Sequence, residues 1–216
     1  MLSARTWTSM EETSVGDTIR QRHLAMALSR LPEHPQTNAA DEQYSTEGDL
    51  AARWLSAIDG LENRRVADLG AGNGVLGIGA HLLGASHVWL IEADSDAAEV
   101  ARTASSSFPD VEVLVHRIDG ELPAEVQPET VIMNPPWGWQ TKAADRPLLI
   151  AAMKSSADLI HLMHSAKATH IERLAEEHAW SANPTLEAEF RLPARYQHHV
   201  SRMSSTPVKC WRLSRD

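Results

Sequence analysis

The stretch that decides the fold is Val66-Ala67-Asp68-Leu69-Gly70-Ala71-Gly72-Asn73-Gly74. Residues 66–69 have the character of a short buried strand, and residues 75–83 continue as a helix. Glycines between a strand and a helix let the backbone turn sharply and approach a ligand that a Cβ atom would exclude. The N-terminus of the following helix adds free N–H groups and partial positive charge. The stretch therefore predicts a nucleotide-binding turn in an α/β fold.

Strand and helix patterns alternate outward from this turn as far as Met163, which predicts a parallel sheet with helices on both faces. Two strands close to the C-terminus predict an antiparallel edge. We therefore expect an α/β, doubly wound, mostly parallel seven-stranded sheet. Its expected strands are residues 66–69, 88–91, 111–115, 130–133, 159–163, 186–192 and 208–213.

An acidic residue, Glu92, ends the second expected strand about 20 residues beyond the glycines, where a carboxylate can hold two ribose hydroxyls. Residues 72–77 also satisfy the dinucleotide pattern G-x-G-x-x-G, so an NAD site and a merely structural turn stay open at this point. Asp119 follows the third strand, where methyltransferases often place a polar group against the cofactor's adenine amine. Asp119 and the tetrapeptide that follows the fourth strand favour S-adenosyl-L-methionine over NAD.

The fourth expected strand leads into Asn134-Pro135-Pro136-Trp137. Two prolines fix φ and remove two backbone donors, so the loop is stiff. Asn134 Oδ1 and the Pro135 carbonyl can then accept the two N–H groups of a planar amine and direct its lone pair at an electrophilic methyl group. Trp137 offers a flat face on which a base can stack. The tetrapeptide predicts a catalytic loop for amine methylation.

These motifs resemble the amino-directed methyltransferases, which carry Asn/Asp-Pro-Pro-aromatic at this point. Three segments, residues 42–46 (Glu-Gln-Tyr-Ser-Thr), 131–138 and 192–199, are similar to the archaeal and eukaryotic small-subunit ribosomal RNA adenine methyltransferases. The resemblance implies a Rossmann-like class I methyltransferase fold. Trp137 stands where that family usually has Phe, Glu92 where Asp is common, and His198 where Phe is usual.

The resemblance implies roles for individual residues. Asn134, Pro135, Pro136 and Trp137 would be the catalytic set. The residues expected to contact S-adenosyl-L-methionine are Gln43, Thr46, Asp68, Gly70, Gly72, Asn73, Val75, Glu92, Asp119 and Asn134.

The resemblance also implies the substrate, which is the exocyclic amine of an adenine in RNA. The RNA expected is ribosomal RNA. Eukaryotic relatives pair with a small zinc-containing activator protein, so a similar partner is expected here.

Two other functions stay open. A release-factor-modifying family uses Asn-Pro-Pro-Tyr on a glutamine amide, although Trp137 and the residues 42–46 do not match it. A non-catalytic ligand-binding module is disfavoured by the intact tetrapeptide.

Composition sets the remaining expectations. The chain has 216 residues, 43% of them hydrophobic, and a net charge of −9. No apolar run approaches the roughly 20 residues that span a bilayer, residues 1–17 are polar, and Cys210 is the single cysteine. A cytoplasmic protein with no membrane contact is expected, with a polar extension over residues 1–18 and one methyltransferase domain over residues 19–216.

Two features invite a functional interpretation that the sequence alone does not decide. The chain has 11 histidines, including His161, His164, His170 and His178, but their spacing matches no known ligand set, so no metal site is expected. Residues 191–216 carry six basic side chains against one acid. This basic segment is either a solvated pair of strands or a track for RNA phosphates.

Overall fold

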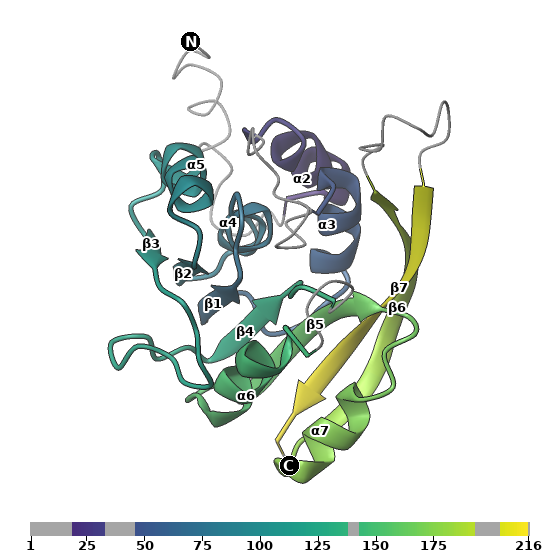
Figure 1. Ribbon diagram of the computed structural model, residues 1–216. Helices are drawn as coiled ribbons and strands as arrows, with labels where there is room; N and C mark the ends of the chain where they lie inside the picture. The colour runs from purple at the N-terminus through teal and green to yellow at the C-terminus, as the bar shows by residue number, and fades with distance from the viewer. Residues whose placement is uncertain (1–18, 33–45, 138–142, 193–203, 216) are drawn as a thin grey trace.

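The computed structural model describes residues 19–32, 46–137, 143–192 and 204–215, and its strands form one seven-stranded sheet. Figure 1 shows this sheet crossing the molecule from β3 to the β6–β7 pair, in the order β3-β2-β1-β4-β5-β7-β6. The strands β1 to β5 run parallel to one another, whereas β7 pairs antiparallel with both β5 and β6. The expected fold class is confirmed. The strands are β1 (Arg65–Leu69), β2 (His87–Glu92), β3 (Val111–Val115), β4 (Thr130–Met133), β5 (Leu159–Ser165), β6 (Ser181–Leu192) and β7 (Ser204–Ser214).

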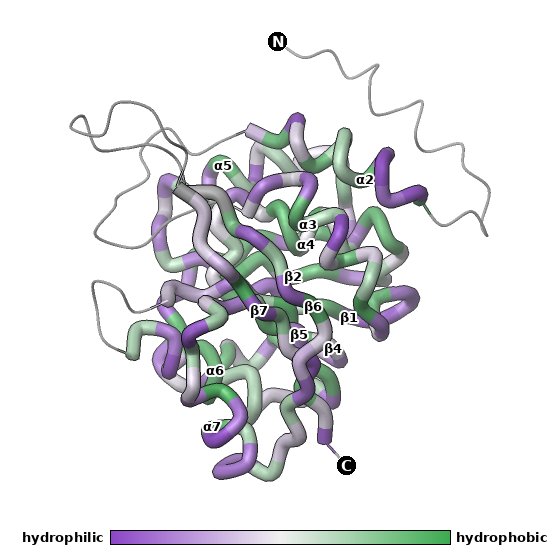
Figure 2. The backbone as a smooth tube through the Cα atoms, turned by 90° about the vertical axis from the view of Figure 1, so that its right-hand side faces the viewer, coloured by the Kyte–Doolittle hydropathy of each residue, from purple (hydrophilic) through white to green (hydrophobic). Residues whose placement is uncertain are grey.

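Helices cover both faces of the sheet, because each face is apolar and must be removed from water. One face carries the four helices α2 (Gln21–Leu28), α3 (Gly48–Leu55), α4 (Val75–Leu82) and α5 (Ser95–Ser105). The other face carries α6 (Arg146–Lys154) and α7 (Ile171–Glu177). Figure 2 shows hydrophobic residues concentrated around α4 and the central strands, with hydrophilic residues on outer segments such as α7. The described helices include none long and apolar enough to cross a membrane.

Helix α4 packs directly against the sheet at Gly77, where no side chain intervenes. A Cβ atom at Gly77 would lie 2.1 Å from Leu90 Cδ2 and 3.0 Å from Val88 Cγ1. Both neighbours belong to the buried strand β2. The third glycine of the G-x-G-x-x-G pattern therefore serves helix–sheet packing, which brings the start of α4 down onto the carboxyl end of β1.

Gly77→Ala should lower the free energy of unfolding by about 1 to 3 kcal/mol, because an extra methyl group in a packed core forces its neighbours to shift. Urea denaturation of the variant measures this. Glu99→Ala, on the exposed face of α5, is the control and should change stability by less than about 0.5 kcal/mol. Equal stability of the Gly77 variant and the parent would contradict the packing role.

The last two strands are longer than the sequence indicated. We expected strands over residues 186–192 and 208–213, but β6 begins at Ser181 and β7 extends from Ser204 to Ser214. Pro184 interrupts the strand pattern of residues 181–185, which is why the start of β6 was missed. The register shifts between Pro184 and Leu186, and β6 is an edge strand, so the proline is accommodated at a bulge.

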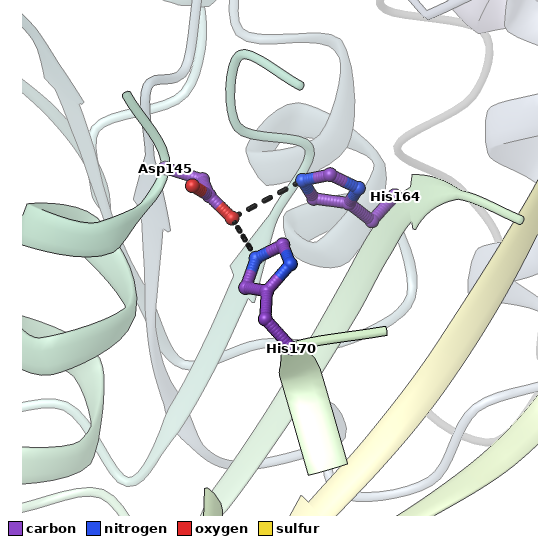
Figure 3. A group of neighbouring side chains, drawn as sticks. All are labelled: Asp145, His164 and His170. Carbon is purple, nitrogen blue, oxygen red and sulfur yellow. Dashed lines mark hydrogen bonds and ion pairs between the residues drawn. The ribbon is translucent and has the colours of Figure 1, made fainter. Parts of the chain in front are cut away.

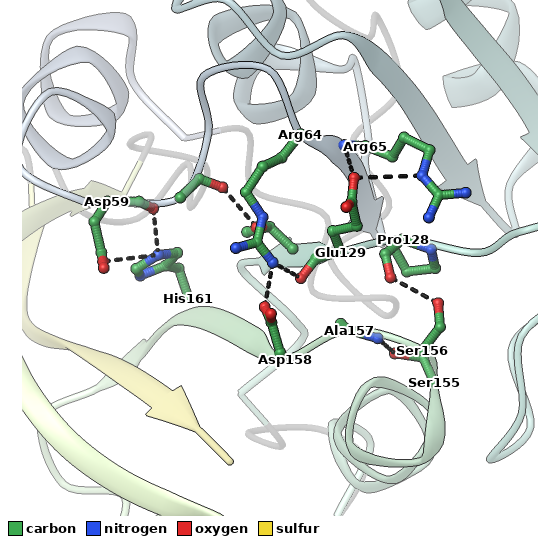
Figure 4. Close-up of polar contacts among 12 residues, drawn as sticks. Asp59, Arg64, Arg65, Pro128, Glu129, Ser155, Ser156, Ala157, Asp158 and His161 are labelled. Atoms are coloured by element: carbon green, nitrogen blue, oxygen red, sulfur yellow. Dashed lines mark hydrogen bonds and ion pairs between the residues drawn. The ribbon is translucent and has the colours of Figure 1, made fainter. Parts of the chain in front are cut away.

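Polar contacts hold the amino-terminal edge of the parallel strands (Figure 4). The Arg64 guanidinium donates to the Asp158 carboxylate and to the Glu129 carbonyl, and the Arg65 backbone N–H donates to Glu129 Oε2 at 3.0 Å. His161, deep in β5, has its Nε2 2.9 Å from the Asp59 carbonyl. These contacts join the segments before β1, β4 and β5, and they leave the opposite, carboxyl edge for a ligand.

Two arginines of the basic segment take part in similar structural contacts. Arg212 makes a bidentate ion pair with Asp59, with N–O distances of 3.0 to 3.2 Å. Arg215 donates to the carbonyls of Met153 and Ser155 and lies over the Trp180 ring. Both are thus occupied within the chain, and Arg212 pairs in register with His161, far from the carboxyl edge. The contacts of these two residues favour a structural role for this part of the basic segment. Arg195 and Arg202 lie outside the described residues.

Candidate active site at the carboxyl ends of β1, β2 and β4

The two predicted motifs meet where the strand order reverses. Asp68 of β1 pairs in parallel register with Ile132 of β4, so the loops that follow these strands leave the same edge of the sheet side by side. In open α/β sheets, ligands bind outside the carboxyl ends of the strands at such a switch point. The glycine turn and the tetrapeptide, which are distant in the sequence, are thereby brought together.

The glycine turn is fixed to the end of β2 through Glu92. Gly70, Gly72 and Gly74 all have positive φ, between 55° and 83°. The Gly72 N–H donates to Glu92 Oε2 at 2.8 Å, and the Asp94 N–H donates to Oε1 at 2.9 Å. A Cβ atom at Gly72 would meet no atom within 4 Å, so this part of the turn faces open space. Each Glu92 oxygen retains a further lone pair for a ligand hydroxyl.

Asp68 lies beneath the turn and supports the start of α4. Its side chain is buried, with the residue 1% exposed, and Oδ2 accepts the Gly77 N–H at 2.8 Å. Among the described residues, Oδ1 has no hydrogen-bond partner. Burial raises the pKa of the Asp68 carboxyl to about 7; the Gly77 N–H opposes this shift and the nearby Glu92 charge adds to it. A buried acid thus sits directly below the expected cofactor site.

The other expected cofactor residues border the same edge. Asn73 is buried, donates from Nδ2 to the Pro32 carbonyl at 3.1 Å, and leaves Oδ1 without a partner among the described residues. Val75 is the buried first residue of α4. Asp119 follows β3 and is exposed. Gln43 lies outside the described residues. The orphaned oxygens of Asp68 and Asn73 show a polar environment that the described residues do not satisfy.

The tetrapeptide is held by its own side chains. Asn134 donates from Nδ2 to the buried Thr46 hydroxyl at 3.1 Å, and its Oδ1 accepts the Trp137 indole N–H at 3.0 Å. An indole nitrogen only donates, so the atom facing it must be the amide oxygen. The half-buried Trp137 ring packs edge-on against Phe190, with centroids 5.1 Å apart. The orientation of the Asn134 amide is therefore set from both ends.

Sequence spacing missed one cluster beside this loop. Asp145, His164 and His170 come together with their ligand atoms all within 4.8 Å of one another (Figure 3). The His164 ring also contacts Trp137, with centroids 6.2 Å apart. Asp145 is distant in the sequence from the two histidines, and only the packing of α6 and α7 against β5 brings the three together, so no local pattern could have found the whole cluster.

Comparison with known proteins identifies the family to which the chain belongs. The methyltransferase small domain family matches residues 45–160, more than half of the chain. The chain is 34% identical to an uncharacterised protein of Methanocaldococcus jannaschii over 91% of this chain and 95% of that protein. It is 30% identical to the rRNA N(6)-adenosine-methyltransferase METTL5 of Danio rerio, over 84% of this chain and 92% of the relative.

A solved structure agrees with these sequence matches. A proposed RNA methyltransferase of Pyrococcus horikoshii superimposes with a TM-score of 0.81 and 32% identity, covering 91% of this chain and 98% of that one. The NAD-binding alternative is thereby set aside. The chain belongs to the methyltransferase small domain family, together with METTL5, and is an S-adenosyl-L-methionine-dependent methyltransferase.

Proposed function

We propose that the chain transfers a methyl group from S-adenosyl-L-methionine to the exocyclic N6 amine of an adenine in ribosomal RNA. The observation that carries the proposal is the oriented Asn134 amide at the end of β4, next to the glycine turn after β1. The match to METTL5 over 92% of that protein supports the same target. The alternative of protein glutamine methylation is not favoured, because Trp137 and the long matches do not point to that class.

The cofactor supplies an electrophilic methyl group on a sulfonium, and the glycine turn fits it. We assign the ribose hydroxyls to Glu92, whose carboxylate is already held by two backbone N–H groups. Gly70, Gly72 and the start of α4 would border the cofactor where no Cβ intervenes. Thr46, Asn73, Val75 and Asp119 would complete the surroundings from the edges, with Gln43 assigned from the sequence alone. Asp68 would act through the turn that it supports.

Asn134 and Pro135 would hold the target amine. An aryl amine is a weak nucleophile because its lone pair is delocalised into the ring. Two acceptors angled at its hydrogens favour a more pyramidal nitrogen, and this preorganised geometry needs no strong base. A carbonyl oxygen has two lone pairs, so Asn134 Oδ1 can accept a target N–H while it still holds the Trp137 indole N–H. Pro136 would keep the loop rigid, and Trp137 would stack on the base.

Trp137→Phe tests whether the indole N–H orients the amide. Phenylalanine still presents an aromatic face, so stacking on the base should be largely kept. The 3.0 Å bond to Asn134 Oδ1 adds a cost, because one neutral hydrogen bond contributes about 1 kcal/mol. We expect transfer about 5-fold slower, with RNA affinity nearly unchanged. Single-turnover kinetics with a separate RNA-binding titration measures this, and an unchanged rate would show that the indole N–H has no orienting role.

The biological target is tested by nucleoside analysis. Ribosomal RNA from cells with and without the gene would be digested and its methylated nucleosides quantified by mass spectrometry. The proposal expects a fraction of N6-methyladenosine that disappears without the gene and returns with the wild-type gene, but not with an Asn134→Ala gene. An unchanged N6-methyladenosine content in ribosomal RNA would reject this target.

We also propose that a small zinc-containing activator protein binds the chain, and that the pair acts in the cytoplasm. The outer edge of β3 supports such a partner, since among the described strands β3 pairs with β2 alone and Val115 is 47% exposed. An exposed strand edge can accept a strand from another chain. The single cysteine, Cys210, is free and buried, which fits a reducing compartment.

A further inference from the structure

We propose that Asp145, His164 and His170 form a binding site for one divalent transition-metal ion of the Zn²⁺ or Co²⁺ type. The three ligand atoms come from three separate elements. Asp145 immediately precedes α6, His164 lies in β5 and His170 immediately precedes α7. Figure 3 shows both imidazole rings directed at the same carboxylate. Two imidazoles and one carboxylate are a donor set that such ions accept, whereas Mg²⁺ and Ca²⁺ prefer oxygen ligands only.

Burial makes this cluster unusual. The side chains of Asp145 and His164 are 4% and 2% exposed, and a charge or polar group so far from water needs compensation. His164 receives little of it. Among the described residues, neither of its ring nitrogens has a hydrogen-bond partner, although Nε2 lies only 3.2 Å from Asp145 Oδ2. Both rings face the same carboxylate, so a cation held between the three ligand atoms would compensate for their burial.

The distances are compatible with a small ion. Ligand atoms about 2.0 to 2.1 Å from a tetrahedral Zn²⁺ lie roughly 3.3 Å from one another, close to the 3.2 Å between His164 and Asp145. His170 Nε2 is closer, 2.5 Å from the same oxygen, and forms a hydrogen bond there. An ion would require His170 to withdraw by less than about 1 Å. Its side chain is 38% exposed and stands at a helix end, where such a shift is least restricted.

An ion at this position would tie the start of α6, the end of β5 and the start of α7 together. The His164 ring packs against Trp137, with ring centroids 6.2 Å apart, so the ion and its ligands would lie directly behind the loop assigned to the target base. With three protein ligands, a fourth position would remain for water. The role would be structural support of the base side of the active site, and it does not depend on which substrate is methylated.

The test uses the full chain without a polyhistidine tag. Co²⁺ is titrated while its visible absorption is recorded, and Zn²⁺ is then used to displace it; calorimetry gives the stoichiometry. We expect one ion per chain and a raised melting temperature, because an ion that binds only the folded state stabilises it. His170→Gln should weaken the apparent affinity at least about 10-fold to 100-fold. It alters the most exposed ligand and should not prevent folding.

His178→Gln is the matched control, since His178 ends the same helix α7 but lies outside the cluster. It should bind the ion like the parent. Failure of the parent to bind either ion, or equal binding by the His170 variant, would overturn the site and leave Asp145, His164 and His170 as a hydrogen-bonded clamp. Neither readout involves methyl transfer, so the result stands apart from the proposed function.

Discussion

Asn134→Ala is expected to slow methyl transfer to RNA by about 10² to 10³, equivalent to roughly 3 to 4 kcal/mol. The amide oxygen would be lost at the point where the amine nitrogen develops positive charge in the transition state. Its effect should therefore fall on the chemical step and leave the affinity for S-adenosyl-L-methionine nearly unchanged. Single-turnover kinetics, with cofactor affinity measured by calorimetry, separates the two quantities.

Asn134→Asp is the matched control for this experiment. It keeps an acceptor oxygen in the same place, and its second oxygen can accept the Thr46 hydroxyl that now accepts the Asn134 Nδ2–H. The related amino-directed enzymes use either Asn or Asp here, so the Asp variant should transfer much faster than the Ala variant. If both variants lose activity equally, the acceptor is not what matters. If Asn134→Ala transfers at the parent rate, the tetrapeptide has no part in the chemistry.

Asp68→Asn is expected to change how stability depends on pH. Burial raises the pKa of Asp68 to about 7 in the folded protein, against an ordinary value of 3.8. The folded chain therefore keeps this proton between about pH 4 and pH 7, whereas the unfolded chain releases it. Stability from this group is fully present below pH 4 and is lost as pH rises through 7. At 1.36 kcal/mol for each pH unit, the loss is at most about 4 kcal/mol.

Urea denaturation of the parent and of Asp68→Asn at pH 5 and pH 8 measures this effect. The neutral amide cannot titrate, so the parent should lose more stability than the variant between the two values. His161 acts in the opposite direction, because burial lowers its pKa to about 4 and folding then gains stability as pH rises. That contribution is common to both proteins and cancels in the comparison. If the free energy of unfolding changes equally in the two proteins between pH 5 and pH 8, Asp68 is already ionised in the folded chain at both values.

The sequence was most informative where local pattern and function coincide. The glycine turn, Glu92 at the end of β2 and the Pro-Pro loop after β4 were all predicted by spacing, since each depends on residues within a few positions. The parallel register of β1 and β4 then brought the two loops together. The same reasoning failed for the start of β6, because Pro184 interrupts the strand pattern and only its place at a sheet edge makes it tolerable.

Contacts between distant segments could not be predicted. The hydrogen bond from Asn134 to Thr46 spans 88 residues. The Trp137 indole N–H donates to Asn134 within the same loop, but this bond depends on side-chain rotamers that the sequence does not specify. The cluster of Asp145, His164 and His170 requires two helices to begin on the same side of β5. Charge counting left the basic segment undecided, and the structure shows that Arg212 is paired with Asp59 in the folded chain. Pairing, not composition, decides which charges remain available.

Methylation of the adenine amine of ribosomal RNA through the Asn134 loop can be measured in a purified system. The direct measurement is incubation of the purified protein with methyl-labelled S-adenosyl-L-methionine and small-subunit ribosomal RNA, followed by digestion to nucleosides. The activator would be supplied in a parallel reaction. We expect label in N6-methyladenosine with the parent chain and its near absence with Asn134→Ala. Label in another nucleoside, or in protein glutamine when release factor replaces the RNA, would contradict it.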